Sequence, residues 1–402
     1  MPSVLSLGCE LIGGSSSAFD LAERLAPWRD RTVLPDVLVV LAGTRTAEIE
    51  GISAAGSTAE ARRYTAIADA ELLLHGPSHL PCWPLPPLPA GVSPALISWV
   101  AVQALGLTPQ VAALGLPQSP PFTHLRMESP HLGPSACLRT GRAMAVSRVQ
   151  HLWNQGYRLG SALRRPLVLA ECVPGGTTTA QAVLQGLGVP VHDLVSGSAL
   201  HPPLLLKRRL VDEGLAAAAL PALANPLAVV AAVGDPFQAF AAGVVLGAVK
   251  AQQPVMLAGG SQMLAVIALV LSRCAAGEHS AIARWLMVGT TAWLAAERLE
   301  ASTKALNRPA FPQVLDRLEA QFQVPLLALA CGLHFQNSRH PQLRAYEQGY
   351  VKEGVGAGGL ALLAQLRGVP LLQLQRACDR AMDALGARQQ WGGDQNVSPP
   401  AF

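Results

Sequence analysis

Two carboxylates in this sequence stand beside glycine-rich turns, where a protein can bring an acid or a base close to a ligand. Glu171 ends an apolar run and precedes residues 175–178, Gly-Gly-Thr-Thr, and Glu353 precedes Gly354 and Gly356. Glycine lets the backbone approach a ligand closely, and free N–H groups at a helix start bind anions. A carboxylate beside such a turn can accept a proton from a substrate. Because the two motifs are far apart in the chain, only the fold can bring them together.

Each motif also has a structural interpretation that the sequence leaves open. Thr177 and Thr178 could cap the helix that follows them. Lys352 and Glu353 could form a solvated pair in a flexible loop. Neither motif alone decides between ligand binding and these structural roles.

Two further glycine-containing turns precede predicted helices. In the first, Gly234 precedes Asp235, which we interpret as a helix N-cap with Pro236 at the first helical position. In the second, Gly259 and Gly260 form a turn of the type that binds phosphate. None of the turns matches a Gly-x-Gly-x-x-Gly or Walker sequence, so dinucleotide or triphosphate binding is disfavoured.

The densest basic stretch, Lys207-Arg208-Arg209, could hold a phosphate group or form the solvated face of a helix. It is too short to line a nucleic-acid groove, and the net charge is only +4, so we expect no nucleic-acid partner. The cysteines are never spaced as Cys-x-x-Cys, and the histidines show no ligand spacing. We therefore expect no metal site, no disulfide framework and no cofactor.

Composition excludes several classes of protein. Of the 402 residues, 50% are hydrophobic and 14% are charged, which excludes an intrinsically disordered chain or a coiled coil. The most apolar region, 215–271, is interrupted by residues such as Asp235 and Lys250, so it lacks the roughly 18 apolar residues that a membrane span needs. The N-terminus lacks the pattern of a signal peptide. We expect a cytoplasmic protein with no membrane partner.

The elements that must position these motifs follow from the apolar runs. Runs of strand length, each leading into a turn with Gly, Ser or Thr or into a Cys-Gly pair, lie at 37–41, 166–170, 254–258, 285–288 and 324–330. Predicted helices near these runs lie at 178–187, 237–251, 262–275 and 358–366. Short apolar strands that alternate with helices indicate a parallel sheet buried on both faces. We predict an open, mostly parallel, Rossmann-like α/β sheet with helices on both faces, which binds ligands at the carboxyl ends of its strands.

The remaining segments are richer in proline or helix signals. Residues 78–89 and 109–121 are Pro-rich, and helices are predicted at 95–105, 143–156 and 371–387. We predict a smaller, mostly helical region from residues 1–36, 75–160 and 370–402. We assign 37–74 and 161–369 to an α/β nucleotide-binding domain. The tail from Gln389 onward is predicted to be mobile.

The glycine-rich blocks, in this order, resemble the nicotinate-nucleotide–dimethylbenzimidazole phosphoribosyltransferase family, of which the chain looks like a divergent branch. The family motif Glu-Met-Gly-Ile-Gly-Asn-Thr-Thr corresponds to residues 171–178, and its Val-Gly-Gly-(Pro/Leu)-Glu-Ile-Ala helix start to 233–248. Its Pro-Val-Leu-Leu-Asp-Gly-Phe strand corresponds to 254–260, and its Leu-Gly-Glu-Gly-Thr-Gly-Ala-Ala segment to 351–359. The blocks keep their order and spacing from about residue 37 to residue 365.

The chain also departs from the family pattern. Ala258 stands where the family has the Asp of Asp-Gly-Phe, a plausible ribose contact. Residues 42–45, Ala-Gly-Thr-Arg, replace Ala-Asp-His-Gly, and Gly176 replaces the Asn of Gly-Asn-Thr-Thr. These changes fall mainly where the acceptor base and the ribose would lie.

The resemblance implies an enzyme that transfers phosphoribose from nicotinate mononucleotide to a benzimidazole-like or purine base, giving the α-riboside phosphate of a cobamide lower ligand. It implies a homodimer, Glu353 as the catalytic base and Glu171 beside the acceptor. The implied substrate-binding residues are Glu171, Gly175, Gly176, Thr177, Thr178, Lys207, Gly234, Asp235, Gly259, Gly260, Gly354 and Gly356. Two alternatives stay open: a related enzyme on this fold that uses water or another acceptor, and a nucleotide-binding or regulatory protein with lost or altered catalysis.

Overall fold

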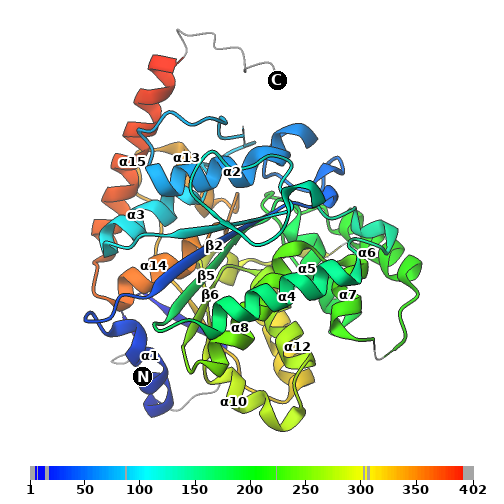
Figure 1. The fold of residues 1–402 in the computed structure, drawn as a ribbon. Coiled ribbons are helices and arrows are strands. Elements are labelled where there is room, and N and C mark those ends of the chain that lie inside the picture. Colours follow the sequence, from blue (N-terminus) through cyan, green and yellow to red (C-terminus); the bar gives the residue numbers. More distant parts are fainter. Residues whose placement is uncertain are drawn as a thin grey trace.

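The computed structural model describes residues 5–6, 8–13, 18–86, 88–222, 224–301, 304–305 and 308–392. In this part of the chain an eight-stranded sheet with the order β1-β10-β7-β6-β5-β2-β3-β4 crosses the molecule (Figure 1). Its strands are β1 (Glu10–Gly13), β2 (Asp36–Ala42), β3 (Gln110–Leu114), β4 (Leu125–Arg126), β5 (Leu167–Cys172), β6 (Val255–Ala258), β7 (Leu286–Thr290) and β10 (Leu327–Ala330). The edge strand β1 is antiparallel to β10, and the other pairs are parallel. A separate pair, β8 (Glu300–Ala301) and β9 (Lys304–Ala305), is antiparallel.

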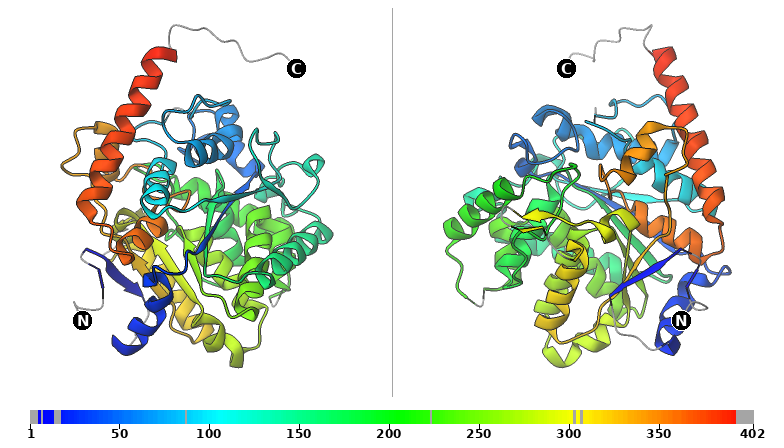
Figure 2. Two further views of the ribbon diagram at one scale, coloured as in Figure 1. Left: turned by 60° about the vertical axis from the view of Figure 1, so that its left-hand side comes forward. Right: turned by 180° about the vertical axis from the view of Figure 1, so that it is seen from behind.

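Helices cover both faces of the sheet (Figures 1 and 2). One face is covered by α4 (Val146–Ser161), α5 (Gly176–Gly186), α6 (Leu204–Ala218), α7 (Pro226–Val233), α8 (Pro236–Lys250), α9 (Ser261–Ser272), α10 (His279–Ala283) and α12 (Ala310–Phe322). The other is covered by α1 (Ala18–Arg29), α2 (Ala59–His75), α3 (Ala95–Leu105), α13 (Pro341–Glu347), α14 (Ala357–Leu366) and α15 (Leu371–Gly392). The short helix α11 (Ala292–Ala296) follows β7.

The central strands are apolar over most of their length because both of their faces are buried. In β2, Leu38 and Val40 pack into one core, and Val37, Val39 and Leu41 into the other. All of these side chains are buried. This two-sided burial is the reason that continuous apolar runs predicted a parallel sheet, and the predicted fold class is confirmed.

Some elements differ from the sequence-based prediction. Residues 109–121, which we interpreted only as Pro-rich, contain β3, which pairs with β2 in the sheet. Helix α4 begins at Val146 rather than at 143, because the N–H groups of Ala143 and Met144 donate instead to carbonyl groups of α7. The division of the chain into two regions stays a prediction. Helix α15 continues to Gly392, and the rest of the tail predicted to be mobile lies outside the described residues.

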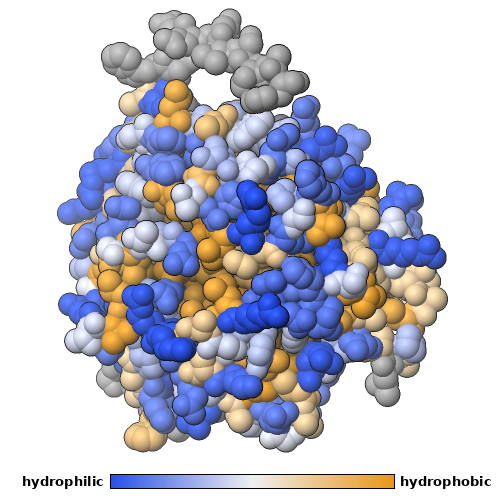
Figure 3. Space-filling view, in the orientation of Figure 1, coloured by the Kyte–Doolittle hydropathy of each residue, from blue (hydrophilic) through white to orange (hydrophobic). Residues whose placement is uncertain are grey.

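None of the helices in the described ranges combines the length and apolar character that crossing a bilayer requires. The face drawn in Figure 3 carries hydrophilic and hydrophobic residues side by side.

Helices α4 and α8 pack closely because glycines from each face the backbone of the other. A Cβ atom at Gly160 would lie 2.1 Å from the Val244 carbonyl oxygen, and one at Gly243 would lie 2.2 Å from that of Trp153. No real Cβ atom is found that close to a backbone oxygen. The close contact therefore depends on glycine, which has no side chain, at these positions. It holds α8 against the sheet, and the cavity described below lies at the edge of that sheet.

We predict that Gly243→Ala destabilises the protein by roughly 1–3 kcal/mol, as expected for overpacking, because the helices must separate. Gly386→Ala is the matched control: this glycine lies in α15 with nothing within 4 Å of an added Cβ. The control should raise stability by up to about 1 kcal/mol through helix propensity. Urea unfolding of both variants measures the difference, and equal effects would contradict the tight α4–α8 contact.

Candidate active site

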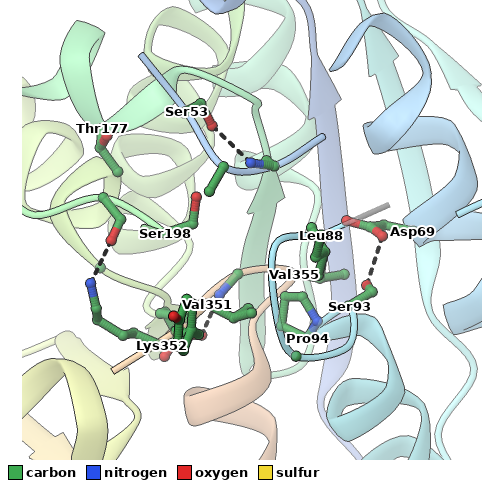
Figure 4. Close-up of a pocket in the computed structure, with 18 of the residues that line it drawn as sticks. Ser53, Asp69, Leu88, Ser93, Pro94, Thr177, Ser198, Val351, Lys352 and Val355 are labelled. Atoms are coloured by element: carbon green, nitrogen blue, oxygen red, sulfur yellow. Dashed lines mark hydrogen bonds between the residues drawn. The ribbon is translucent and has the colours of Figure 1, made fainter. Parts of the chain in front are cut away.

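A cavity of about 670 Å³ lies at the carboxyl ends of β5 and β6, where α5 and α9 begin (Figure 4). This edge is where open α/β sheets bind ligands. Gly176 and Thr177 of α5 and Ser261 and Gln262 of α9 line the cavity. The first N–H groups of a helix have no partner within the helix. Two helix N-termini therefore border one cavity and favour an anion there.

The fold brings part of the predicted site together. The predicted residues that line the cavity are Glu171, Gly175, Gly176, Thr177, Gly260, Glu353 and Gly354. The predicted residues outside this lining are Thr178, Lys207, Gly234, Asp235, Gly259 and Gly356. The two carboxylate motifs also meet through the backbone, since the N–H of Val355 donates to the carbonyl oxygen of Glu171 at 3.0 Å.

The Glu353 carboxylate is held on both of its oxygens. Oε2 accepts hydrogen bonds from the Thr290 hydroxyl at 3.0 Å and the Thr291 N–H at 2.9 Å. Oε1 accepts from the N–H groups of Gly354 and Gly358 at 3.0 and 3.2 Å. Burial raises the pKa of Glu353 to about 6, while these donors oppose the shift by favouring the charged form. At neutral pH this carboxylate is therefore mostly ionised and can accept a proton.

Glu171 lies at the end of β5 in a different environment. Burial, followed by the nearby charges of Asp235 and Glu353, raises the pKa of Glu171 to about 8. The backbone N–H of Val173 opposes this shift. At neutral pH Glu171 is therefore mostly a neutral acid, unlike Glu353, which lines the same cavity.

Lys207 is fully buried just behind the cavity wall. Its Nζ donates to the carbonyl oxygens of Val195 at 2.7 Å and Ser196 at 2.5 Å, and to the Thr177 hydroxyl at 3.3 Å. Burial, with a smaller contribution from Lys352, lowers the pKa of Lys207 to about 7 against the opposing charge of Glu297. Because Thr177 lines the cavity, the ammonium group lies one hydrogen bond away from it.

The neighbouring arginines lie at the surface of α6. Arg209 pairs with Glu213 one turn along the helix, and its side chain is 74% exposed. Arg208 pairs with Asp193. The interpretation as a solvated helix face agrees with the position of Arg209, whereas Arg208 is half-buried.

Asp235 is a buried helix cap, as the sequence indicated. Its Oδ1 accepts from the N–H of Gln238 at 3.3 Å in a capping box that starts α8. Its Oδ2 accepts from Thr179 at 2.5 Å and from Gln262 at 2.8 Å. Gln262 lines the cavity, whereas Asp235 does not. Asp235 therefore holds Gln262, a residue of the cavity wall, in place. Burial raises the pKa of Asp235.

The structure corrects the interpretation of the first threonines as helix caps. The N-cap of α5 is Gly175, with no side-chain capping bond. Thr178 is fully buried, and its hydroxyl has no hydrogen-bond partner in the described part of the chain. Thr177 instead accepts a hydrogen bond from Lys207.

The glycines around α14 serve mainly to bring this helix onto the sheet. Gly356 has φ +73°, and a Cβ atom there would lie 2.6 Å from the Cβ of Ala170. A Cβ at Gly359 would lie 2.4 Å from the Cβ of Ala258. Ala258 is therefore fully buried against α14, which approaches it closely because residue 359 is a glycine.

Several residues of the cavity carried no signal in the sequence. Asp69 of α2 is buried, lines the cavity and accepts hydrogen bonds from the Ser93 hydroxyl at 2.6 Å and the Cys172 thiol at 3.5 Å. Burial raises the pKa of Asp69 to about 6. Figure 4 shows Asp69 and Ser93 on the side of the cavity away from Thr177 and Lys352. Asp69 belongs to a helix with no unusual pattern, so its role depends on the fold alone.

The structure excludes the alternative interpretation of Lys352 as part of a solvated pair with Glu353. Its side chain is 2% exposed and forms an ion pair with Glu297, with Nζ 2.9 Å from Oε1. Both residues line the cavity. No group of three or more His, Cys, Asp or Glu residues within the described ranges could hold a metal ion.

Comparisons with known proteins agree with this fold and site. A family model described as "Phosphoribosyltransferase" matches residues 100–306, which include Glu171 and Lys207. The UPF0284 protein of Parasynechococcus marenigrum (strain WH8102) is 57% identical over 381 residues, covering 95% of each chain. The UPF0284 protein of Prochlorococcus marinus (strain MIT 9313) is 56% identical over 385 residues, covering 96% of this chain and 94% of the relative.

Solved structures show the same fold at lower identity. CobT from Thermus thermophilus matches with a TM-score of 0.56 and 21% identity, covering 90% of this chain and 88% of that one. A structure of nicotinate-nucleotide-dimethylbenzimidazole phosphoribosyltransferase from the same organism matches with a TM-score of 0.55 and 20% identity, covering 89% and 87%.

The sheet, its ligand-binding edge and the family match define a transferase, and more narrowly a phosphoribosyltransferase. The chain belongs to this phosphoribosyltransferase family and, within it, to the UPF0284 proteins. The resemblance inferred from the glycine-rich blocks is thereby confirmed.

We predict that Glu171→Gln stabilises the protein, and more so at pH 8 than at pH 5. The pKa of Glu171 rises from an ordinary 4.5 to about 8 in the folded protein. Between these values the folded chain binds a proton that the unfolded chain has lost, so wild-type stability falls as pH rises. Glutamine removes this dependence.

Denaturant unfolding at the two pH values measures the effect. Glu60→Gln, at an exposed position of α2, is the control and should change stability little at either pH. A gain that does not grow with pH would mean that Glu171 is ionised in the folded protein.

Proposed function

We propose that this enzyme transfers phosphoribose from nicotinate mononucleotide to a ring nitrogen of a benzimidazole-like or purine base, giving the α-riboside phosphate of a cobamide lower ligand. The observation that carries the proposal is the geometry of one cavity, which the carboxyl-bearing residues Glu353 and Glu171 line together with the N-termini of α5 and α9. The cavity therefore places a group that can accept a proton beside donors that can hold a phosphate.

The proposed reaction needs a base but no acid. A nitrogen lone pair of the acceptor attacks C1′ of the ribose as the bond from C1′ to the nicotinate nitrogen breaks. The electron pair returns to the pyridinium ring, which leaves neutral at nitrogen. The acceptor must then lose its ring proton, and the ionised Glu353 carboxylate is the group proposed to take it.

Glu171 has a different proposed role. Because it is mostly protonated at neutral pH, its carboxyl group can hydrogen-bond the acceptor ring without competing for the proton. Holding both reactants in line can supply roughly 7–11 kcal/mol of the barrier reduction. A cavity with helices on two sides supports this role of positioning.

The phosphate is proposed to lie at the N-termini of α5 and α9. Thr177 and Ser261 supply backbone and hydroxyl donors there, with Lys207 behind Thr177. We further propose, from the family resemblance, that the enzyme acts as a cytoplasmic homodimer. Light scattering after size-exclusion chromatography measures the oligomeric state.

Product analysis tests the proposal directly. The protein is incubated with nicotinate mononucleotide and a panel of benzimidazole and purine acceptors, and the products are separated and identified by mass. We expect nicotinate and an α-riboside phosphate in equal amounts. Nicotinate released without an equal amount of riboside phosphate would indicate hydrolysis, and binding without turnover would indicate a regulatory protein.

We predict that Glu353→Gln lowers the rate of transfer by about 10²–10⁴-fold, the usual contribution of general-base catalysis, while nucleotide binding survives. Part of the loss should return at higher pH, where the acceptor's proton can leave to solvent. An unaltered rate would remove Glu353 as the base and make Glu171 the next candidate.

Thr290→Val is the companion variant, because it removes one donor to Glu353 and leaves the carboxylate in place. Loss of a hydrogen bond to the charged form raises the pKa of Glu353 further. The acidic limb of the pH–rate profile should therefore move to higher pH while the maximal rate changes less than in Glu353→Gln.

We predict that Lys207→Met weakens the binding of nicotinate mononucleotide more than Arg209→Ala does, because Lys207 lies beside the cavity and Arg209 is exposed on α6. Methionine keeps the length of the buried stem and removes the charge. Equilibrium titration measures both dissociation constants, and melting curves check that each variant is folded. Equal, small effects would place the phosphate elsewhere.

A further inference from the structure

Asp69 is a carboxylate of the cavity wall that the proposed mechanism does not use. It lies in α2, and 5% of its surface is exposed. Thr65, one helical turn earlier, also lines the cavity, so this face of α2 forms part of the wall. The Thr65 hydroxyl already donates to the carbonyl oxygen of Ala55 at 2.7 Å. Asp69 is therefore the residue through which α2 brings a charged group to the cavity.

The Asp69 carboxylate keeps unused capacity to accept hydrogen bonds. Its Oδ1 accepts from the Ser93 hydroxyl at 2.6 Å, and Figure 4 shows the carboxylate pointing toward Ser93 and Leu88. Its Oδ2 lies 3.5 Å from the Cys172 thiol, which is a weak donor. No lysine or arginine in the described part of the chain forms an ion pair with Asp69. An ionised carboxylate has about four acceptor sites, so most of them are free for a ligand.

The side of the cavity around Asp69 is largely apolar. Leu88, Pro94 and Val355 line the cavity, and Figure 4 shows them on the same side as Asp69, away from Thr177. Apolar side chains pack well on the faces of a flat ring, but they offer no partner to a polar group on its edge. A ligand pocket of this kind takes its specificity from the few polar groups within it.

A structural role explains only part of this arrangement. The Ser93 hydroxyl has a second partner, because it also accepts from the N–H of Ala95 at 3.1 Å. Burial of a charge without a cation costs free energy, and it raises the pKa of Asp69 to about 6. The carboxyl group is still mostly ionised at neutral pH, so it acts only as an acceptor. A ligand that binds to it must bring an N–H or O–H donor.

The proposed reaction places the acceptor base on this side of the cavity. The phosphate is proposed to lie at the N-terminus of α5, on the side opposite to Asp69 (Figure 4). The loop that carries Glu353 crosses to β5, where the N–H of Val355 donates to the Glu171 carbonyl oxygen at 3.0 Å. Asp69 contacts the next residue of β5, Cys172. Because the ring proton of the acceptor is assigned to Glu353, a carboxylate further along the base needs a second donor.

We propose that Asp69 is a specificity residue that accepts a hydrogen bond from an exocyclic amino group of the acceptor base, so that the site selects amino-substituted purines over methylated benzimidazoles. The inference rests on the proposed function, because it assumes that a heteroaromatic base binds in this cavity. In DNA recognition, Asp and Glu accept hydrogen bonds from the amino group of cytosine in the same way. A methyl group in that place would leave the buried carboxylate without a partner, which is costly.

The test compares two bases of nearly equal shape, 6-aminopurine and 6-methylpurine, by equilibrium titration of the wild-type protein with each. An apolar slot alone favours the methyl group, whereas a carboxylate favours the amino group. Wild type should bind 6-aminopurine about tenfold or more tightly, as expected for a hydrogen bond to a charged group. It should also bind 6-aminopurine more tightly than 5,6-dimethylbenzimidazole, which has no amino group.

Variants of Asp69 assign the preference to this residue. Asp69→Leu roughly keeps the size of the side chain and removes both acceptor oxygens, so the preference should reverse in favour of 6-methylpurine. Asp69→Asn keeps one acceptor oxygen without the charge and should give an intermediate ratio. Asp212→Asn, at an exposed position of α6, is the matched control and should leave the ratio unchanged. Melting curves check that each variant is folded, and the ratio in the wild type needs no variant.

The outcomes separate this inference from the proposed function. A wild type that binds both purines equally, or prefers 6-methylpurine, overturns the inference even if transfer to a base is observed. An Asp69→Leu variant that keeps the wild-type ratio also overturns it. A preference that Asp69→Leu abolishes in a protein without transferase activity contradicts the proposed function and supports recognition by Asp69. A protein that binds none of the bases overturns both.

Discussion

The hydrogen bonds to the Glu353 carboxylate are the interaction on which the cavity depends. They join the end of β7, through Thr290 and Thr291, to the start of α14, through Gly354 and Gly358. A carboxylate at a helix N-terminus is stabilised by the free N–H groups and the helix dipole. Five residues of the 351–356 loop have positive φ, three of them not glycine, and such a backbone persists only where surrounding contacts hold it. The same contacts keep Glu353 ionised although it is buried, which is the state that a base requires.

The carboxyl groups around the cavity differ in pKa because each has different hydrogen-bond donors and charged neighbours. Glu353 is surrounded by hydrogen-bond donors and has a pKa of about 6, whereas Glu171 has few donors and two acidic neighbours, and its pKa is about 8. On the side where Thr177 and Lys352 lie, two buried lysines, Lys207 and Lys352, stand near one carboxylate, Glu297, and two helix N-termini. The side with Asp69 has a carboxylate without a lysine or arginine ion pair among the described residues. The cavity is therefore electrostatically uneven along its length, which suits a ligand with a phosphate at one end and a heteroaromatic ring at the other.

Close backbone packing explains why glycine-rich motifs surround a site that they only partly line. Gly356 and Gly359 allow α14 to rest on β5 and β6, and Gly160 and Gly243 allow α4 to rest on α8. In both places the glycines shorten the distance between two elements, and this packing is their role rather than contact with a ligand. Ala258 takes part in this packing, since a Cβ atom at Gly359 would lie 2.4 Å from its Cβ.

The sequence alone determined the sheet and much of its edge. Strands buried on both faces are largely apolar, so the positions of β2, β5, β6, β7 and β10 and their parallel orientation could be predicted. The order of the glycine-rich blocks indicated the family. The N-cap Asp235 was predictable because capping depends on neighbouring residues only. Other features were not predictable, because each depends on a partner distant in the chain. Strand β3 pairs with β2, and Asp69 accepts a hydrogen bond from Ser93. Glu297 and Lys352 form a buried ion pair with each other. Local pattern records which side chains must be buried, but only the tertiary structure decides which buried charges meet and therefore which of them can hold a proton or a ligand.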